Sequence, residues 1–124
     1  MVNKQVLAVD DSKTMREMVS FTLRNAGYSV VEADDGKSAI DTLAEHNDID
    51  LIITDLNMPG MDGFSVVEHA RSHPSHKFVP ILILTTESDV AKKERGKAAG
   101  ATGWIVKPFN PEKLVQVVGK VCPL

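Results

Sequence analysis

Cysteine is almost absent from this sequence, and several other features that mark specialised proteins are also scarce. Cys122 is the one cysteine among 124 residues, which excludes an intrachain disulfide and a cysteine-built metal site and favours a reducing compartment. The 14 lysines and arginines are outnumbered by 17 aspartates and glutamates, so the formal net charge is −3. A nucleic-acid partner is disfavoured, because its phosphates would have to be bound against this charge.

Long apolar runs are missing as well. Runs such as Ile81-Leu82-Ile83-Leu84 fall far short of the roughly 20 residues that a bilayer crossing needs. The first residues, 1–5, lead into no long apolar stretch, so we expect no secretory signal, no membrane contact and a cytoplasmic location. The composition, with 43% hydrophobic and 25% charged residues, is typical of a globular protein. We expect a single domain over residues 1–124, with no output domain.

Five short apolar runs, rich in β-branched residues, alternate with segments of helical spacing. The runs are residues 6–9, 29–31, 51–53, 81–84 and 104–106, and each is typical of a buried strand. Because such strands need cover on both faces, the sequence predicts a doubly wound α/β domain whose parallel sheet lies between two layers of helices. The usual order of five strands in this flavodoxin-like, three-layer arrangement is 2-1-3-4-5.

Two of the expected helices have clear end signals. The last helix can be capped by Asn110, has Pro111 at its first position and carries Glu112 near its positive end. The first helix ends at Gly27, which tolerates a left-handed backbone. Its apolar face would consist of Met15, Met18, Val19, Thr22 and Ala26. Residues 71–77 are interpreted as a polar loop.

Charged and hydroxyl side chains follow four of the predicted strands where each strand ends. They are Asp10, Asp11, Asp55, Thr85, Thr86 and Lys107. The carboxyl ends of parallel strands meet at one edge of a sheet, so these side chains should cluster. Each pair of carboxylates repels by about 4 kcal/mol at ~4 Å, and a cation is needed to offset this. Oxygen ligands favour Mg²⁺, with Mn²⁺ as the alternative. Lys107 and Thr85 could then hold a tetrahedral anion attached to one carboxylate.

At these strand ends the sequence resembles the receiver domain of two-component response regulators. The resemblance covers essentially the whole chain and rests on four motifs in order. They are Asp10-Asp11, Asp55-Leu56-Asn57-Met58-Pro59-Gly60-Met61-Asp62-Gly63, Thr85, and Lys107-Pro108-Phe109. The resemblance implies the strand order 2-1-3-4-5 and a phosphorelay signalling module. Such a module is not a conventional enzyme, although it catalyses its own phosphorylation and dephosphorylation.

The resemblance also implies a role for each residue of the cluster. Asp55 would be the phosphoacceptor that attacks a phosphohistidine on a sensor histidine kinase. Lys107 would pair first with Asp55 and then with the phosphoryl oxygens, and its peptide bond to Pro108 would be cis. The ligands of Mg²⁺ would be Asp10, Asp11, Asp55 and the backbone carbonyl of Asn57.

A second set of residues would pass the signal on. Thr85 would hydrogen-bond the phosphoryl group and move with it, with the backbone amide of Thr86 as a further candidate donor. Trp104 occupies the position of the family's switch aromatic. Because an indole is larger than the usual ring and must keep its N–H satisfied, it either rotates in part or remains a contact residue in both states. Asn57 and Glu87 would tune hydrolysis of the acyl phosphate. The output face, on the fourth helix, fifth strand and fifth helix, would carry Lys92, Lys93, Arg95, Lys97, Trp104, Lys113 and Val115.

The partners implied are the sensor kinase and an effector protein, with a phosphatase as a further candidate. The run Asp11-Ser12-Lys13-Thr14-Met15-Arg16 is most similar to chemotaxis regulators, whose effector is the flagellar motor switch. A phosphate sink in a pathway unrelated to motility is the alternative output. We expect a monomer, with a weak dimer through the output face as the alternative.

Other functions remain open on the sequence alone. A haloacid-dehalogenase phosphatase also uses a strand-end aspartate with Mg²⁺, but its second aspartate is replaced by Asn57. A flavin domain shares the topology but needs a phosphate-binding loop that is not seen here. Residues 36–38 are similar to the end of a nucleotide-binding loop, yet Val31 stands where its first glycine belongs. His69 and His73 have the spacing of a zinc pair, and with His76 they could bind adventitious metal.

Overall fold

A parallel sheet with the strand order β2-β1-β3-β4-β5 forms the centre of the computed structural model, which describes residues 4–124. Its strands are β1 (Gln5–Val9), β2 (Ser29–Ala33), β3 (Leu51–Thr54), β4 (Ile81–Thr85) and β5 (Gly103–Val106). In register, Val6 of β1 lies between Val30 of β2 and Leu51 of β3. The predicted strand order is therefore confirmed. The first residues, on which the expected lack of a secretory signal depends, lie partly outside the described residues.

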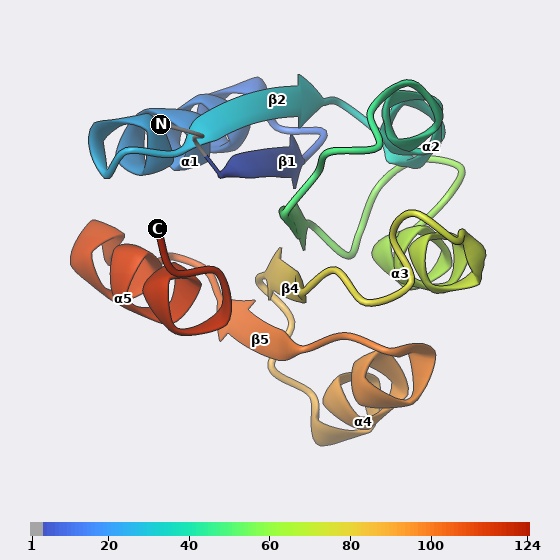
Figure 1. Ribbon diagram of the computed structural model, residues 1–124. Coiled ribbons are helices and arrows are strands. Elements are labelled where there is room, and N and C mark those ends of the chain that lie inside the picture. The colour runs from blue at the N-terminus through green and yellow to red at the C-terminus, as the bar shows by residue number, and fades with distance from the viewer. Residues whose placement is uncertain (1–3) are drawn as a thin grey trace.

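Helices cover both faces of the sheet, with α1 and α5 on one face and α2, α3 and α4 on the other (Figure 1). Their bounds are α1 (Lys13–Asn25), α2 (Gly36–Glu45), α3 (Gly63–Ser72), α4 (Val90–Ala99) and α5 (Pro111–Val121). The predicted three-layer α/β arrangement is thus confirmed. Within residues 4–124, each helix is too short or too polar to cross a bilayer.

The core consists of two apolar clusters, one on each face of the sheet. Leu7 and Ile52 pack with α2 and α3, whereas Val6 and Ile53 pack with α1 and α5. Alternate side chains of the same strand therefore serve opposite layers. The prediction that all strands are buried is wrong for the two outer ones. β2 and β5 have a neighbouring strand on one side only, and Val106 remains 37% exposed.

The predicted ends of α1 and α5 are confirmed. The Asn110 side chain accepts hydrogen bonds from the backbone N–H groups of Glu112 (2.8 Å) and Lys113 (3.4 Å), and Gly27 has φ of 103° after the end of α1. The predicted apolar face of α1 is wrong at Met18, which is 46% exposed. α1 is anchored instead by the buried side chains of residues 19 and 23, because α5 covers only part of its surface.

Arg71 is not part of a polar loop, as the sequence had suggested, because α3 continues to Ser72. Its guanidinium group donates hydrogen bonds to the carbonyl oxygens of Gly100 (3.0 Å), Val79 (2.6 Å) and Lys77 (3.2 Å). These acceptors lie on the segments that lead out of α3 and α4. Arg71 therefore ties together the connections at the amino ends of β4 and β5.

The histidines near this connection take part in packing. His76 is fully buried, and its Nε2 lies 2.9 Å from the carbonyl oxygen of His46. The ring of His73 lies beside it, with 4.8 Å between the ring centroids. Within residues 4–124, the side chains that gather in groups of three or more with metal-ligating atoms are aspartates at the other end of the sheet. The structure therefore gives no support to a histidine metal site.

Candidate functional site

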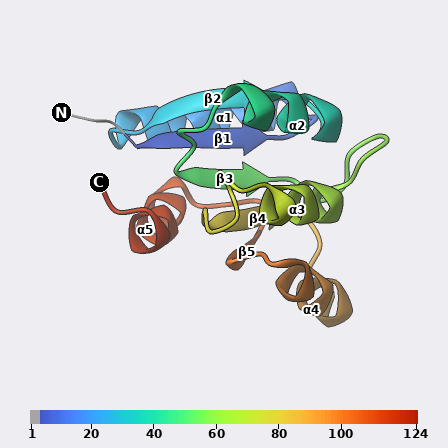
Figure 2. The same cartoon turned by 45° about the vertical axis from the view of Figure 1, so that its right-hand side comes forward.

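The residues predicted to form a site come together at the carboxyl ends of the strands. β1, β2 and β3 point the same way in Figure 2, toward the edge where these residues lie. Asp10 and Asp55 directly follow β1 and β3, Thr85 ends β4, and Lys107 follows β5. The backbone N–H of Asp55 donates to the carbonyl oxygen of Val9 (2.8 Å). Hydrogen bonding between neighbouring strands thus sets the position of the Asp55 backbone.

Three carboxylates form the centre of this cluster. One oxygen atom each from Asp10, Asp11 and Asp55 lies within 4.8 Å of the others. Asp10 is 4% exposed and Asp55 is 8% exposed, whereas Asp11 is exposed. Two acids therefore lie at the bottom of the site and one lies at its mouth. Oxygen ligands at this separation fit a single hard cation that keeps part of its water shell.

Lys107 supplies the positive charge of the cluster. Its Nζ lies 2.7 Å from Oδ2 of Asp10 and 3.5 Å from Oδ2 of Asp55. The expected ion pair between Lys107 and Asp55 is present, although the shorter contact of Lys107 is with Asp10. The ammonium group lies between two buried carboxylates and binds more closely to the one with less access to water.

Burial makes Asp55 a weaker acid than an exposed aspartate. It raises the pKa of Asp55 above the ordinary value of 3.8, the attraction of Lys107 lowers that pKa in part, and the neighbouring Asp10 carboxylate raises it further. The backbone N–H of Leu56 also donates to Oδ1 of Asp55 (2.8 Å) and favours the charged form. The net effect is that a negative charge at Asp55 is costly until further positive charge arrives.

Glu87 links the cluster to α4 and to the edge strand. Its backbone N–H donates to Oγ1 of Thr85 (3.3 Å), and its carbonyl oxygen accepts from Nε1 of Trp104 (2.9 Å). Its carboxylate lies 3.0 Å from Nζ of Lys92 and accepts from Nδ2 of Asn57 at 3.5 Å. Residues that the sequence assigned to the switch, to the output face and to the tuning of hydrolysis therefore meet at one glutamate.

Two supports of the site were missed by sequence reasoning. Arg16 donates from Nη1 to the carbonyl oxygen of Asp10 (2.8 Å) and from Nε to Glu32 on β2 (3.1 Å), and no local pattern joins these three residues. Gly63 begins α3 against the backbone of Asp55, where a Cβ atom would lie only 2.3 Å from the carbonyl oxygen. The Lys107–Pro108 peptide bond is cis, as the resemblance implied.

Part of the predicted output face is assembled on α4, β5 and α5. Lys93, Lys97 and Trp104 line a hollow of about 250 Å³. Trp104 also lines an adjoining hollow with Lys113, of about 520 Å³. The indole ring therefore lies between the basic side chains of α4 and that of α5.

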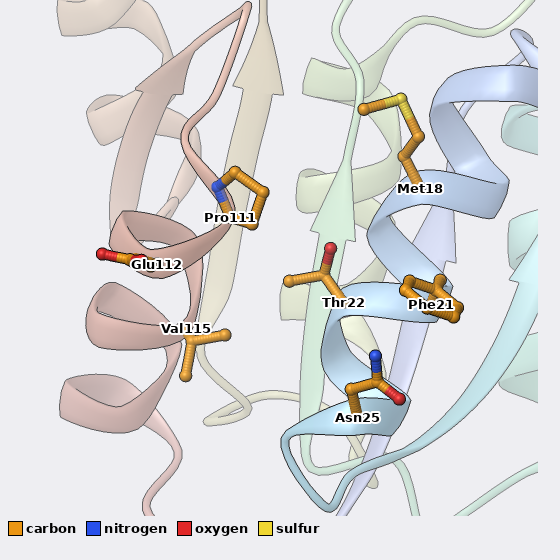
Figure 3. Close-up of a pocket in the computed structure, with 7 residues that line it drawn as sticks. All are labelled: Met18, Phe21, Thr22, Asn25, Pro111, Glu112 and Val115. Carbon is orange, nitrogen blue, oxygen red and sulfur yellow. The ribbon is translucent and has the colours of Figure 1, made fainter.

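The side chains of Arg95 and Val115, which were assigned to this face, lie elsewhere. The guanidinium group of Arg95 is 4.2 Å from the centroid of the Phe64 ring, so it packs toward α3. Val115 lies in an apolar groove of about 550 Å³ between α1 and α5, which Figure 3 shows. The groove is lined by Met18, Phe21, Thr22, Asn25, Pro111, Glu112 and Val115. It is separate from the acid cluster and explains the exposure of Met18.

Comparison with known proteins identifies the family. Residues 6–119 match the response regulator receiver domain. A chemotaxis protein CheY homolog of Campylobacter jejuni is 40% identical over 120 residues, which cover 93% of this chain and 92% of the relative. The structure of the chemotaxis protein CheY4 of Vibrio cholerae superposes with a TM-score of 0.93 at 51% identity, covering 97% of this chain and 99% of that one. The receiver domain of a sensor histidine kinase from Pseudomonas aeruginosa, with a magnesium ion coordinated in its active-site cleft, has a TM-score of 0.89 at 25% identity and covers 99% of this chain and 100% of that one. The chain therefore belongs to the response regulator receiver domain family of two-component signalling.

Proposed function

We propose that Asp55 is the phosphoacceptor of this receiver domain and that it acts with Mg²⁺ bound in the acid cluster. Receiver domains bind Mg²⁺ at an acidic pocket, and the donor set here suits that ion because it consists of carboxylate oxygens without thiolate or imidazole. The observation that carries the proposal is the meeting of Asp10, Asp11 and Asp55 within 4.8 Å, beside the ammonium group of Lys107. The backbone carbonyl of Asn57 would be a further ligand.

The chemistry would be an in-line phosphoryl transfer from a phosphohistidine of the sensor kinase. An oxygen of Asp55 forms a bond to phosphorus while the P–N bond breaks, and the imidazole leaves with the electron pair. Lys107 balances the charge of the transferred group, and the hydroxyl of Thr85 donates to one of its oxygens. When bound, Mg²⁺ would neutralise charge that these residues leave uncompensated.

Phosphorylation would then change the segment between β4 and α4. Once the Thr85 hydroxyl turns to the phosphoryl group, it no longer accepts from the N–H of Glu87. Trp104 is held to the same residue through its N–H, and a Cβ at Gly96 would lie 2.9 Å from its ring. These contacts favour the second of the two expectations for the indole, in which the ring stays against α4 and acts as a contact residue in both states.

The output would pass through the face formed by α4, β5 and α5. Three lysines and one glutamate, Glu94, line the hollows around Trp104 there, and this excess of positive charge suits an acidic partner segment. Receiver domains and CheY homologues interact with histidine kinases and effectors, and the relatives named above are chemotaxis proteins. We infer an effector of the flagellar motor-switch type, with the phosphate sink as the second candidate. The cytoplasmic location, the single-domain organisation over residues 1–124 and the monomeric state remain predictions.

Phosphorylation by a small donor tests the proposal directly. The protein is incubated with Mg²⁺ and acetyl phosphate, and its intact mass is followed. We expect the gain of one phosphoryl group, which is lost in Asp55→Asn and in the absence of Mg²⁺. Steady turnover of many phosphomonoesters would support the phosphatase alternative instead. A stable adduct that forms equally well in Asp55→Asn would show that the acceptor is another residue.

A further inference from the structure

Lys92, which was expected on the output face, pairs its side chain with Glu87 on the segment between β4 and α4. Asp89 caps α4 by accepting from the backbone N–H groups of Ala91 (2.7 Å) and Lys92 (3.2 Å), so Lys92 lies in the first turn. Long side chains in a helix point toward its amino end. Nζ of Lys92 consequently reaches Oε1 of Glu87, 3.0 Å away, on the segment that precedes the helix.

Glu87 is held at both its backbone and its side chain. Trp104 binds its carbonyl oxygen, Thr85 binds its N–H, and Lys92 and Asn57 contact its carboxylate. Asn57 follows the phosphoacceptor by two residues and is exposed. The glutamate carboxylate therefore lies beside an exposed side chain that is two residues from the phosphoacceptor, and we take this to be the rim of the site.

A carboxylate at this rim would repel the donor unless its charge is balanced. Small phosphoryl donors and the phosphoryl group itself are anionic, and the site already contains three carboxylates. The side chains of Lys92 and Glu87 are 44% and 30% exposed, so their pairing contributes little to folding stability. Its consequence lies in the local charge that an approaching anion meets.

We propose that Lys92 is a positioning residue for phosphorylation, which holds the carboxylate of Glu87 at the rim and neutralises it so that anionic donors can enter. The inference rests on the proposed function and concerns the rate at which Asp55 is phosphorylated. Lys92 acts through Glu87 and does not touch the reacting atoms. Its substitution therefore slows entry of the donor without removing the phosphoacceptor or the metal ligands.

The test compares the rate of phosphorylation by acetyl phosphate among matched variants at low ionic strength. Lys92→Met should slow the reaction about three- to fivefold, the effect of one unit charge several ångströms from the donor in a hydrated setting. Lys92→Arg should keep the rate of the unmodified protein, since it preserves the charge. Lys37→Met, which removes the same net charge from an exposed position on α2, should change the rate by less than about twofold.

A double variant shows whether Lys92 works through Glu87. In the Glu87→Gln background the further change Lys92→Met should slow the reaction less than it does in the unmodified protein, because only the direct attraction of the Lys92 charge is then lost and no carboxylate is released. The slowing should appear as a higher acetyl phosphate concentration for half-maximal rate, should fade as salt screens the charges, and should leave the thermal midpoint nearly unchanged.

Equal slowing by Lys92→Met and Lys37→Met would overturn the inference, as would slowing by Lys92→Met that is undiminished in the Glu87→Gln background. In either case the unmodified protein would still take up one phosphoryl group at Asp55, so the proposed function would stand. A lack of phosphorylation in the unmodified protein would instead remove the proposed function.

Discussion

The charged side chains at the two ends of the sheet have opposite kinds of neighbours. At the amino ends of β4 and β5, Arg71 donates hydrogen bonds to the carbonyl oxygens of Gly100, Val79 and Lys77. At the carboxyl ends, Asp10 and Asp55 share one lysine and repel one another. Charge surrounded by neutral acceptors contributes to stability, whereas charge that faces like charge lowers stability until a ligand arrives. The first arrangement serves the fold, and the second leaves a site ready to bind a cation.

The backbone at Gly100 leaves space for the Arg71 side chain. Gly100 ends α4 with φ of 114°, a conformation that favours glycine. A Cβ atom there would lie 2.8 Å from Cγ of Arg71, so the arginine stem occupies the space of the missing side chain. No ligand is needed to complete this end of the molecule.

Removal of Arg71 should have the largest effect on stability. Arg71→Met leaves the carbonyl oxygens at the connection without their charged donor, and we expect the free energy of unfolding to fall by about 3 kcal/mol. Urea denaturation measures the change. Arg24→Met, at a side chain that is 53% exposed, should cost less than about 1 kcal/mol. Similar losses of unfolding free energy in the two variants would show that the Arg71 hydrogen bonds contribute no more to stability than an exposed arginine does.

Addition of Mg²⁺ should have the next largest effect on the free energy of unfolding. The ion should act only at the carboxyl ends of the strands, where the acid cluster lies. At ten times its dissociation constant, an ion that binds only the folded protein adds about 1.4 kcal/mol to the free energy of unfolding. The measurement is denaturation with Mg²⁺ and with a chelator. Arg71→Met should gain as much as the unmodified protein, because distant sites act additively. An unchanged gain in Asp10→Asn would place the ion outside the acid cluster.

Replacement of Asp55 should have a smaller effect, and of opposite sign to that of Arg71. With metal removed, Asp55→Asn should raise the free energy of unfolding at neutral pH, because burial raises the pKa of Asp55 and so makes its charged form unfavourable in the folded state. The folded protein binds this proton more tightly than the unfolded chain, so the gain is full above the raised pKa. It should shrink as the pH falls toward the ordinary value of 3.8. Thermal melts across this range give the answer, and a gain that grows at acid pH would contradict it.

Much of the fold and of the acid cluster could be predicted because it depends on neighbours in the sequence. Apolar runs indicated the strands, and Asn110 and Gly27 marked helix ends through their own local geometry. The carboxyl ends of parallel strands must share an edge, so the proximity of Asp10 and Asp55 could be predicted from the sequence. The loop predicted for residues 71–77 is present from residue 73 on, but the role of Arg71 was missed because its acceptors include Gly100, which lies 29 residues further along the chain.

What the sequence determined by itself is the order of elements and the chemical groups at the end of each strand, since periodicity, capping and strand direction are local properties. Only the tertiary structure decided which charges touch: Lys107 is nearest to Asp10, Lys92 reaches Glu87, and Trp104 is tied to the segment after β4. Contacts of this kind span up to 97 residues. They depend on how helices and strands pack in three dimensions, and a difference of about 1 Å in that packing changes which partner of a side chain is nearest.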